Sequence, residues 1–197
     1  MEVRDMDFRL IRLADTQQLR WKNGAGAARS IWREGDVASP DWELAVAEMT
    51  GTQPFSSYPG VDRSLFVTEG ALVIRSEVRD VTLTPLSEGL EFPGEEVITG
   101  TSPGEGVMLD FNILTRRSVC RHSAVRRLGG QGTELSVAGG WTVVHAALGT
   151  VCVSAGEDVT LHQGDTLILR GSADTPKTVK LRIGSGSAAI TAEILPR

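Results

Sequence analysis

The chain has 197 residues, enough for one domain or two small fused ones, and at this length a core needs no disulfide or metal. Hydrophobic residues make up 41% and charged residues 23%, which excludes a disordered or fibrous chain. The net charge of −5 argues against nucleic acid as a partner, and no apolar run is long enough for a transmembrane helix, so we expect no membrane partner.

Residues 1–12 alternate charged and apolar side chains and lack a secretory hydrophobic region, so we expect a cytoplasmic protein. Beyond them the pattern is that of β-strands, because short runs rich in Val, Leu, Thr and Ile are separated by glycines. These runs cover residues 65–74, 78–83, 107–114, 141–153 and 158–169. Residues 9–19 and 37–48 invite a helix, but neither holds a 3.6-residue period with good caps. The sequence therefore predicts an all-β fold.

A weak internal repeat indicates how the strands are organised. The run around Gly70 and the Asp-Val-Thr-Leu that begins at Asp80 resemble the run around Gly149 and the Asp-Val-Thr-Leu at Asp158. Strand, glycine turn, strand, hairpin and strand in this order are typical of a cupin barrel. We expect two tandem double-stranded β-helix barrels (a bicupin), with residues 1–125 in the first, 126–197 in the second and a linker at 126–133. Chance similarity between two β-rich halves is the alternative.

The repeat also allows a search for a metal site. Many cupins bind metal through His-x-His, a Glu and a later His, at fixed positions relative to the glycine of this repeat. That Glu lies seven residues before the closing glycine, and the count leads to Arg63 in one half and Thr142 in the other. The three histidines, His122, His145 and His162, stand at no ligand spacing. We expect no metal and no cofactor, and a structural or partly exposed role for His145 and His162.

Arg63 places a fixed cation where a metal-binding barrel has an anionic ligand. If it points into the barrel it must be paired there, because an unpaired buried charge is costly. A guanidinium matches a carboxylate through two parallel hydrogen bonds, so the first barrel is a candidate pocket for a small organic acid. An Asp62–Arg63 surface turn is the alternative, and spacing alone leaves both open.

Three segments stand out: residues 21–31, 54–63 and 108–117. The first contains Gly-x-Gly but lacks the third glycine of a dinucleotide fingerprint and the Lys-Ser/Thr ending of a P-loop. In the third, Asp110 and Asn112 share one face of a strand, which fits either a solvent-facing strand or a pocket wall.

Together these segments resemble the HutD/Ves family of bicupin proteins: Trp-Lys-Asn-Gly-Ala-Gly from Trp21, Pro-Phe-Ser-Ser-Tyr-Pro-Gly-Val-Asp-Arg ending at Arg63, and Asp-Phe-Asn-Ile-Leu-Thr-Arg from Asp110. The resemblance covers nearly the whole chain. It implies a metal-free double barrel that binds an intermediate of histidine utilisation as a regulator. With Tyr58 from the second motif, the implied ligand-binding residues are Trp21, Lys22, Asn23, Arg29, Tyr58, Arg63, Asp110 and Asn112.

The chain departs from the family pattern at four positions. Ala28 stands for the usual Thr, Ser30 for a frequent Glu, Glu43 for a frequent Arg, and Ala45 for a common Ser. If those residues contact the ligand in relatives, this chain binds a different acid or none.

We expect a sensor of a small carboxylate such as N-formylglutamate or a related histidine-degradation intermediate. Arg63 would clamp the carboxylate, Asn23 and Asn112 would hydrogen-bond the rest, and Asp110 would hold Arg63. The alternative is a metal-independent enzyme, either an isomerase or an amide or formyl hydrolase. Only Tyr58 and Asp110 could serve it as acid or base, and this scarcity favours binding over catalysis. A structural module with a vestigial pocket is a third reading. A homodimer is compatible with cupin sheets, although no residue identifies an interface.

Overall fold

The computed structural model describes residues 7–21, 25–130 and 132–197, which form two compact units. We call them the 16–121 unit and the 122–196 unit, and the latter also contains residues 7–15. The expected division at 125/126 falls inside strand β12 (Cys120–Leu128). The chain passes from one unit to the other earlier, near the start of that strand. The N-terminal strand β1 (Asp7–Ile11) pairs in the 122–196 unit, whereas we expected it in the first barrel.

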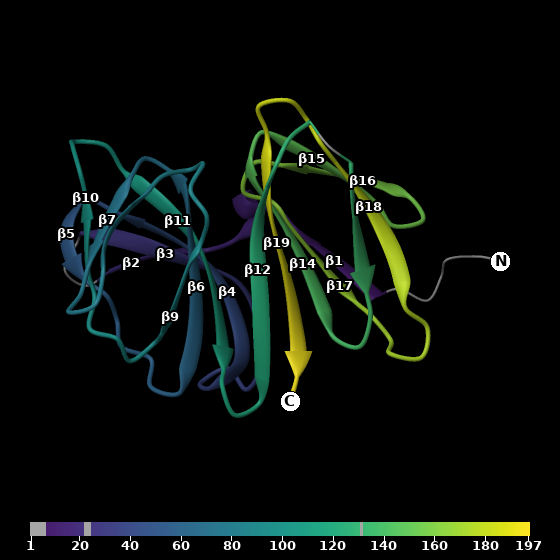
Figure 1. Ribbon diagram of the computed structural model, residues 1–197, viewed down its shortest axis with the longest axis horizontal. Coiled ribbons are helices and arrows are strands. Elements are labelled where there is room, and N and C mark those ends of the chain that lie inside the picture. Colours follow the sequence, from purple (N-terminus) through teal and green to yellow (C-terminus); the bar gives the residue numbers. More distant parts are fainter. Residues whose placement is uncertain (1–6, 22–24, 131) are drawn as a thin grey trace. The chain divides into compact units, whose positions relative to one another are not determined.

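The 16–121 unit contains two antiparallel sheets (Figure 1). In order across the first sheet, the strands are β2 (Gln18–Arg20), β3 (Gly26–Gly35), β4 (Pro40–Met49), β11 (Met108–Arg116), β6 (Val61–Glu69) and β9 (Leu90–Pro93). Across the second sheet they are β5 (Gly51–Pro54), β10 (Thr99–Ser102), β7 (Leu72–Arg75) and β8 (Asp80–Leu83).

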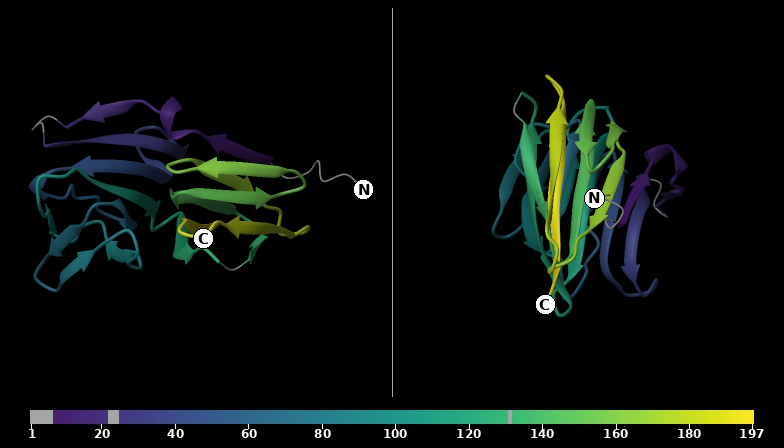
Figure 2. Two further views of the ribbon diagram at one scale, coloured as in Figure 1. Left: turned by 90° about the horizontal axis from the view of Figure 1, so that it is seen from above. Right: turned by 90° about the vertical axis from the view of Figure 1, so that its right-hand side faces the viewer.

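The 122–196 unit also contains two antiparallel sheets, and neighbouring arrows run in opposite directions in Figure 2. The first sheet has the order β1, β17 (Thr166–Arg170), β14 (Trp141–Leu148), β19 (Ala188–Pro196), β12. The second has the order β13 (Thr133–Val137), β18 (Lys177–Ile183), β15 (Thr150–Ser154), β16 (Asp158–His162). A short 3₁₀ turn, η1 (Leu13–Asp15), follows β1.

The internal repeat is present in the strand order. The order β4-β11-β6-β9 in one unit corresponds to β12-β19-β14-β17 in the other, and β5-β10-β7-β8 corresponds to β13-β18-β15-β16. Gly70 and Gly149 occupy equivalent turns, between β6 and β7 and between β14 and β15, and both have positive φ, 73° and 65°. A side chain would be strained there, so these two glycines mark where each hairpin passes from one sheet to the other.

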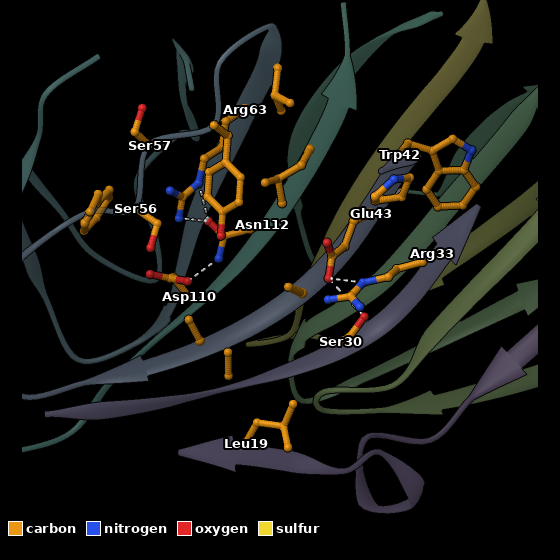
Figure 3. Close-up of a pocket in the computed structure, with 18 of the residues that line it drawn as sticks. Leu19, Ser30, Arg33, Trp42, Glu43, Ser56, Ser57, Arg63, Asp110 and Asn112 are labelled. Carbon is orange, nitrogen blue, oxygen red and sulfur yellow. Dashed lines mark hydrogen bonds and ion pairs between the residues drawn. The ribbon is translucent and has the colours of Figure 1, made fainter. Parts of the chain in front are cut away.

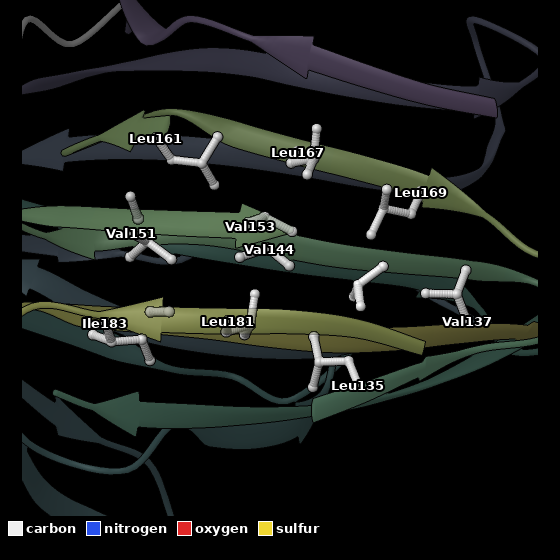
Figure 4. Close-up of a cluster of buried hydrophobic side chains, with 13 residues drawn as sticks. Leu135, Val137, Val144, Val151, Val153, Leu161, Leu167, Leu169, Leu181 and Ile183 are labelled. Atoms are coloured by element: carbon white, nitrogen blue, oxygen red, sulfur yellow. The ribbon is translucent and has the colours of Figure 1, made fainter. Parts of the chain in front are cut away.

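The sheets differ from the barrels that we expected, because none of those in the described part of the chain closes on itself. Each unit instead buries apolar side chains from both of its sheets in a shared core. In the 122–196 unit this core contains Val144 and Leu167 from one sheet and Val153 and Leu181 from the other (Figure 4). In the 16–121 unit Leu65 and Met108 pack with Leu72 and Ile74. Two stacked sheets of alternating strands fill their interior in this way.

The strand runs expected from composition are all present as strands, whereas the expected linker at 126–133 is partly wrong. Residues 126–128 end β12, and Arg126 is buried. The glycines that follow carry the chain into β13. Most of the stretch 37–48, which invited a helix, instead belongs to β4 (Pro40–Met49), whose residues alternate in burial. No helix in the described residues is long and apolar enough to span a membrane.

Candidate functional site

A cavity of about 1040 Å³ lies in the 16–121 unit over the first sheet. The register of the strands explains its wall, because residues directly opposite one another on paired strands point to the same face. One row across β3, β4, β11 and β6 reads Arg33, Glu43, Leu114 and Arg63. All four residues line the cavity.

The next rows on the same face add the remaining polar groups. Ser30, Ala45 and Asn112 form the second row, and Ala28, Ala47 and Asp110 form the third. These six residues also line the cavity. Polar side chains from β6 and β11 therefore lie at one side of the cavity, and Ser30, Arg33 and Glu43 lie at the other (Figure 3). The alanines of the second and third rows lie between these two polar groups.

Arg63, Asn112 and Asp110 form a connected network (Figure 3). Arg63 donates from Nε and Nη2 to Oδ1 of Asn112, at 3.0 and 2.7 Å. Asn112 in turn donates from Nδ2 to Oδ1 of Asp110. Asn112 and Asp110 are 2% and 3% exposed, so this network replaces hydration that the buried groups have lost.

Two neighbouring aromatic rings lie against the Arg63 guanidinium. Its central carbon lies 4.9 Å from the ring centroid of Phe55 and 5.3 Å from that of Phe92. In the described residues Nη1 of Arg63 has no hydrogen-bond partner. Arg63 is thus fixed by stacking and by Asn112, and one of its nitrogens remains available to a molecule in the cavity.

Burial shifts the pKa values of both charged groups in the network. It raises the pKa of Asp110 to about 6, with Arg63 and Asn112 acting in the opposite direction. It lowers the pKa of Arg63, an effect opposed by Asp110 and Tyr58. The site therefore combines a guanidinium with a carboxyl group that takes up a proton close to neutral pH.

The opposite side of the cavity has a second polar cluster. Ser30 Oγ donates to Glu43 Oε1 at 3.0 Å, and Arg33 Nε donates to the same oxygen at 2.9 Å. Four arginines and two carboxylates are found among the described lining residues: Arg20, Arg33, Arg63, Arg116, Glu43 and Asp110. The cavity is therefore locally cationic in a chain whose net charge is −5.

The structure places most of the residues that sequence analysis assigned to ligand binding on this cavity. Trp21, Tyr58, Arg63, Asp110 and Asn112 all line it. The Asp62–Arg63 turn considered as an alternative is instead part of strand β6.

Of the three other candidates, the structure describes only Arg29. Arg29 is not among the lining residues, and its guanidinium binds the Thr16 carbonyl at 2.6 Å and Gln18 Oε1 at 3.3 Å. Arg29 thus links β3 to Thr16, just before β2, and to Gln18, within β2. Lys22 and Asn23 lie outside the described residues.

Asp110 and Asn112 have different roles from those expected. We expected Asp110 to hold Arg63 directly, but Asn112 lies between them in the network. The register gives the reason, since Arg63 pairs with Leu114 and Asp110 is four residues further along β11. At about 3.3 Å per residue this is about 13 Å along the strand, and Asn112 lies halfway. Asn112 thus orients Arg63 with the amide that we had expected to face the ligand.

Neither histidine expected to be structural or partly exposed reaches this cavity. His145 is buried, its Nδ1 lies 2.9 Å from Thr166 Oγ1, and burial lowers its pKa to about 3, so it is neutral. His162 is exposed. Among residues 7–21, 25–130 and 132–197, no group of three or more His, Cys, Asp or Glu side chains is placed to hold a metal ion.

Sequence analysis did not assign Phe55, Arg33, Ser30 or Glu43 to the site. Phe55 is in the motif that ends at Arg63, and this proximity was the available signal. Ser30 and Glu43 had been noted as departures from the family pattern, as had Ala28 and Ala45. All four departures line the cavity.

Comparison with known proteins agrees with this architecture. The chain is 30% identical over 149 residues to Protein Ves of Citrobacter koseri, an alignment that covers 73% of this chain and 78% of that protein. The structure of HutD from Pseudomonas fluorescens superposes with a TM-score of 0.84 at 22% identity, covering 97% of this chain and all of that one. A conserved protein of unknown function from Pseudomonas aeruginosa gives 0.85 at 21% identity, covering 96% and 99%.

The fold is also similar to that of a cupin 2 conserved barrel domain protein from Leptotrichia buccalis, with a TM-score of 0.58 at 11% identity over 95% of this chain and 98% of that one. The HutD family model matches residues 13–189 and so includes both units almost entirely. The three motifs that suggested the HutD/Ves family lie within that match. The chain belongs to the HutD family.

Proposed function

We propose that this protein is a cytoplasmic, metal-free bicupin that binds a small carboxylate metabolite, such as N-formylglutamate or a related intermediate of histidine degradation, and acts as a sensor or regulator of histidine utilisation. The strand order repeated in the two units supports the bicupin interpretation. The observation that most strongly supports a carboxylate ligand is Arg63, held against Phe55 and Phe92 with Nη1 available in the cavity.

The charges and the relatives support the same ligand class. A cavity lined by four arginines and two carboxylates favours an anion. Its volume of about 1040 Å³ is at the upper end of ordinary small-molecule sites, so a metabolite of several carbons fits. The HutD of Pseudomonas fluorescens was solved in a formate condition, and formate is the smallest carboxylate.

The test is a thermal-shift titration with N-formylglutamate, formate, urocanate, glutamate and histidine, with Arg63→Ala measured in parallel. A ligand at 100 times its Kd adds about 2.7 kcal/mol, which raises the Tm of a chain of this size by roughly 5–10 °C. We expect one acid to give such a shift in the unaltered chain and none in the variant. Equal shifts in both proteins would show that Arg63 does not bind the acid.

One observation favours an enzyme as a second candidate. A buried carboxyl group whose pKa is about 6 is matched to general acid or base chemistry near neutral pH, and Asp110 is such a group on the cavity wall. An amide or formyl hydrolase or an isomerase would then require Asp110. Turnover of N-formylglutamate by purified protein, lost in Asp110→Asn, would support it. Binding without turnover would leave the sensor as the function.

A further inference from the structure

A second recognition group faces the cavity two strands away from Arg63. Glu43 is on β4 and Arg63 is on β6, in one row across the sheet with Leu114 of β11 between them. Their side chains therefore project from the same face, and two interstrand spacings separate their backbones by about 10 Å. Glu43 has a side-chain exposure of only 16%, and it lines the cavity.

The two donors that hold Glu43 leave one of its oxygens available. Ser30 and Arg33 both donate to Oε1. In the described residues Oε2 has no hydrogen-bond partner. The carboxylate is thus held in one orientation, and Oε2 can accept a hydrogen bond from a molecule in the cavity.

We propose that Glu43 is a second ligand-binding residue, and that the ligand is an acid with a protonated amine or another N–H donor at its other end. Arg63 would bind the carboxylate and Glu43 the nitrogen, so this inference rests on the proposed function. Because Arg63 and Glu43 project from one face with only two interstrand spacings between their strands, the ligand must be short and carry its carboxylate and its nitrogen at opposite ends. Amino acids of three or four carbons with a terminal amine have this form.

Arg33 could instead bind a second carboxylate, and the ligand would then be a diacid. Its side chain is 44% exposed, compared with 16% for Glu43, so Glu43 is the better enclosed of the pair. A hydrogen bond to a charged group is stronger where water is excluded, which favours the nitrogen donor. The two possibilities require different ligands and are separated by one experiment.

The experiment is isothermal titration calorimetry of the full chain at pH 7.5 with three matched series. β-Alanine and 4-aminobutyrate carry the amine, propionate and butyrate lack it, and malonate and succinate replace it with a second carboxylate. We expect the amino acids to bind at least tenfold more tightly than the monocarboxylates. In Glu43→Gln this advantage should fall to about twofold, because Gln still accepts from Ser30 and Arg33 but no longer offers a charged oxygen to the amine.

The matched control is Glu91→Gln, since exposed Glu91 of β9 lies outside the cavity lining and the charge change is the same. This variant should keep the preference for the amine. Diacids that bind more tightly than the amino acids, or an amine preference that survives Glu43→Gln, would overturn the assignment of Glu43. If an acid of the earlier panel binds through Arg63 but amines give no advantage, this inference fails alone. If no acid depends on Arg63, the proposed function fails with it.

Discussion

Replacing Asp110 with Asn tests the electrostatics of the site directly, because Asn has nearly the same shape but does not ionise. Burial raises the pKa of Asp110 from 3.8 to about 6 in the folded protein. Between these values the folded chain holds a proton on Asp110 that the unfolded chain has lost. The stability contributed by this group is therefore complete below about pH 4 and is lost as the pH rises through 6.

The magnitude follows from the two pKa values. Integrating the difference in protons bound by Asp110 in the folded and unfolded chains from pH 4 to pH 7 gives a loss of about 2.5 kcal/mol in the unfolding free energy. The difference in unfolding free energy, Asp110→Asn minus unaltered chain, should rise by this amount between the two pH values. Any effect of the substitution that does not depend on pH cancels in the comparison, and so do all other titrating groups that behave alike in both proteins.

The assay is urea unfolding at half-unit steps from pH 4 to pH 7, together with an NMR titration of the Asp110 carboxyl carbon. A titration midpoint near 6 and the rising difference are expected. A difference that stays constant across the range, with a midpoint near 4, would refute the conclusion that burial dominates over the attraction of Arg63.

Three further predictions concern His145, Gly26 and Phe55. Burial lowers the pKa of His145 from 6.5 to about 3, so the stability that this group contributes is complete above pH 6.5 and is lost as the pH falls. The unaltered chain should therefore lose about 2 kcal/mol of unfolding free energy between pH 7 and pH 5 that His145→Gln does not lose, measured by urea unfolding. Gly26→Ala would place a Cβ 2.8 Å from the Trp21 ring and 2.3 Å from a backbone carbonyl oxygen of β4; we expect it to cost about 1–3 kcal/mol in the same assay, and full stability would contradict the packing. Phe55→Leu removes one of the two rings stacked on Arg63, which should weaken calorimetrically measured binding of the Arg63-dependent acid several-fold with a loss of about 1 kcal/mol in stability; unchanged affinity would show that stacking does not position the guanidinium.

The sequence alone determined the strand class, the repeat and much of one side of the site. Alternating apolar residues and glycine turns require a sheet, and equal spacing from Gly70 and Gly149 revealed the two equivalent hairpins. The same spacing identified Arg63 before its surroundings were known. Alternation within 108–114 put Asp110 and Asn112 on one face but left open whether it faces solvent or a pocket, and the structure shows both side chains buried on the cavity wall.

Tertiary structure decided which strands are neighbours, and therefore which residues meet. The distance from Arg63 to Asn112 depends on the pairing of β6 with β11, which lie almost fifty residues apart, and no local pattern encodes that register. This is why the relay from Asp110 through Asn112 was not foreseen. The sequence also could not show that the two units would form open sheet pairs, since closure depends on how the edge strands pair.

The clearest case is β3, where Ser30 and Arg33 are three residues apart and would point to opposite faces of a regular strand. The register of β3 against β4 shifts between Ser30 and Trp32, and this bulge turns Arg33 to the same face as Ser30. Both side chains therefore reach Glu43, while Arg29 points away toward β2. One extra residue in the ladder, set by pairing with another strand, decides which charges face the cavity.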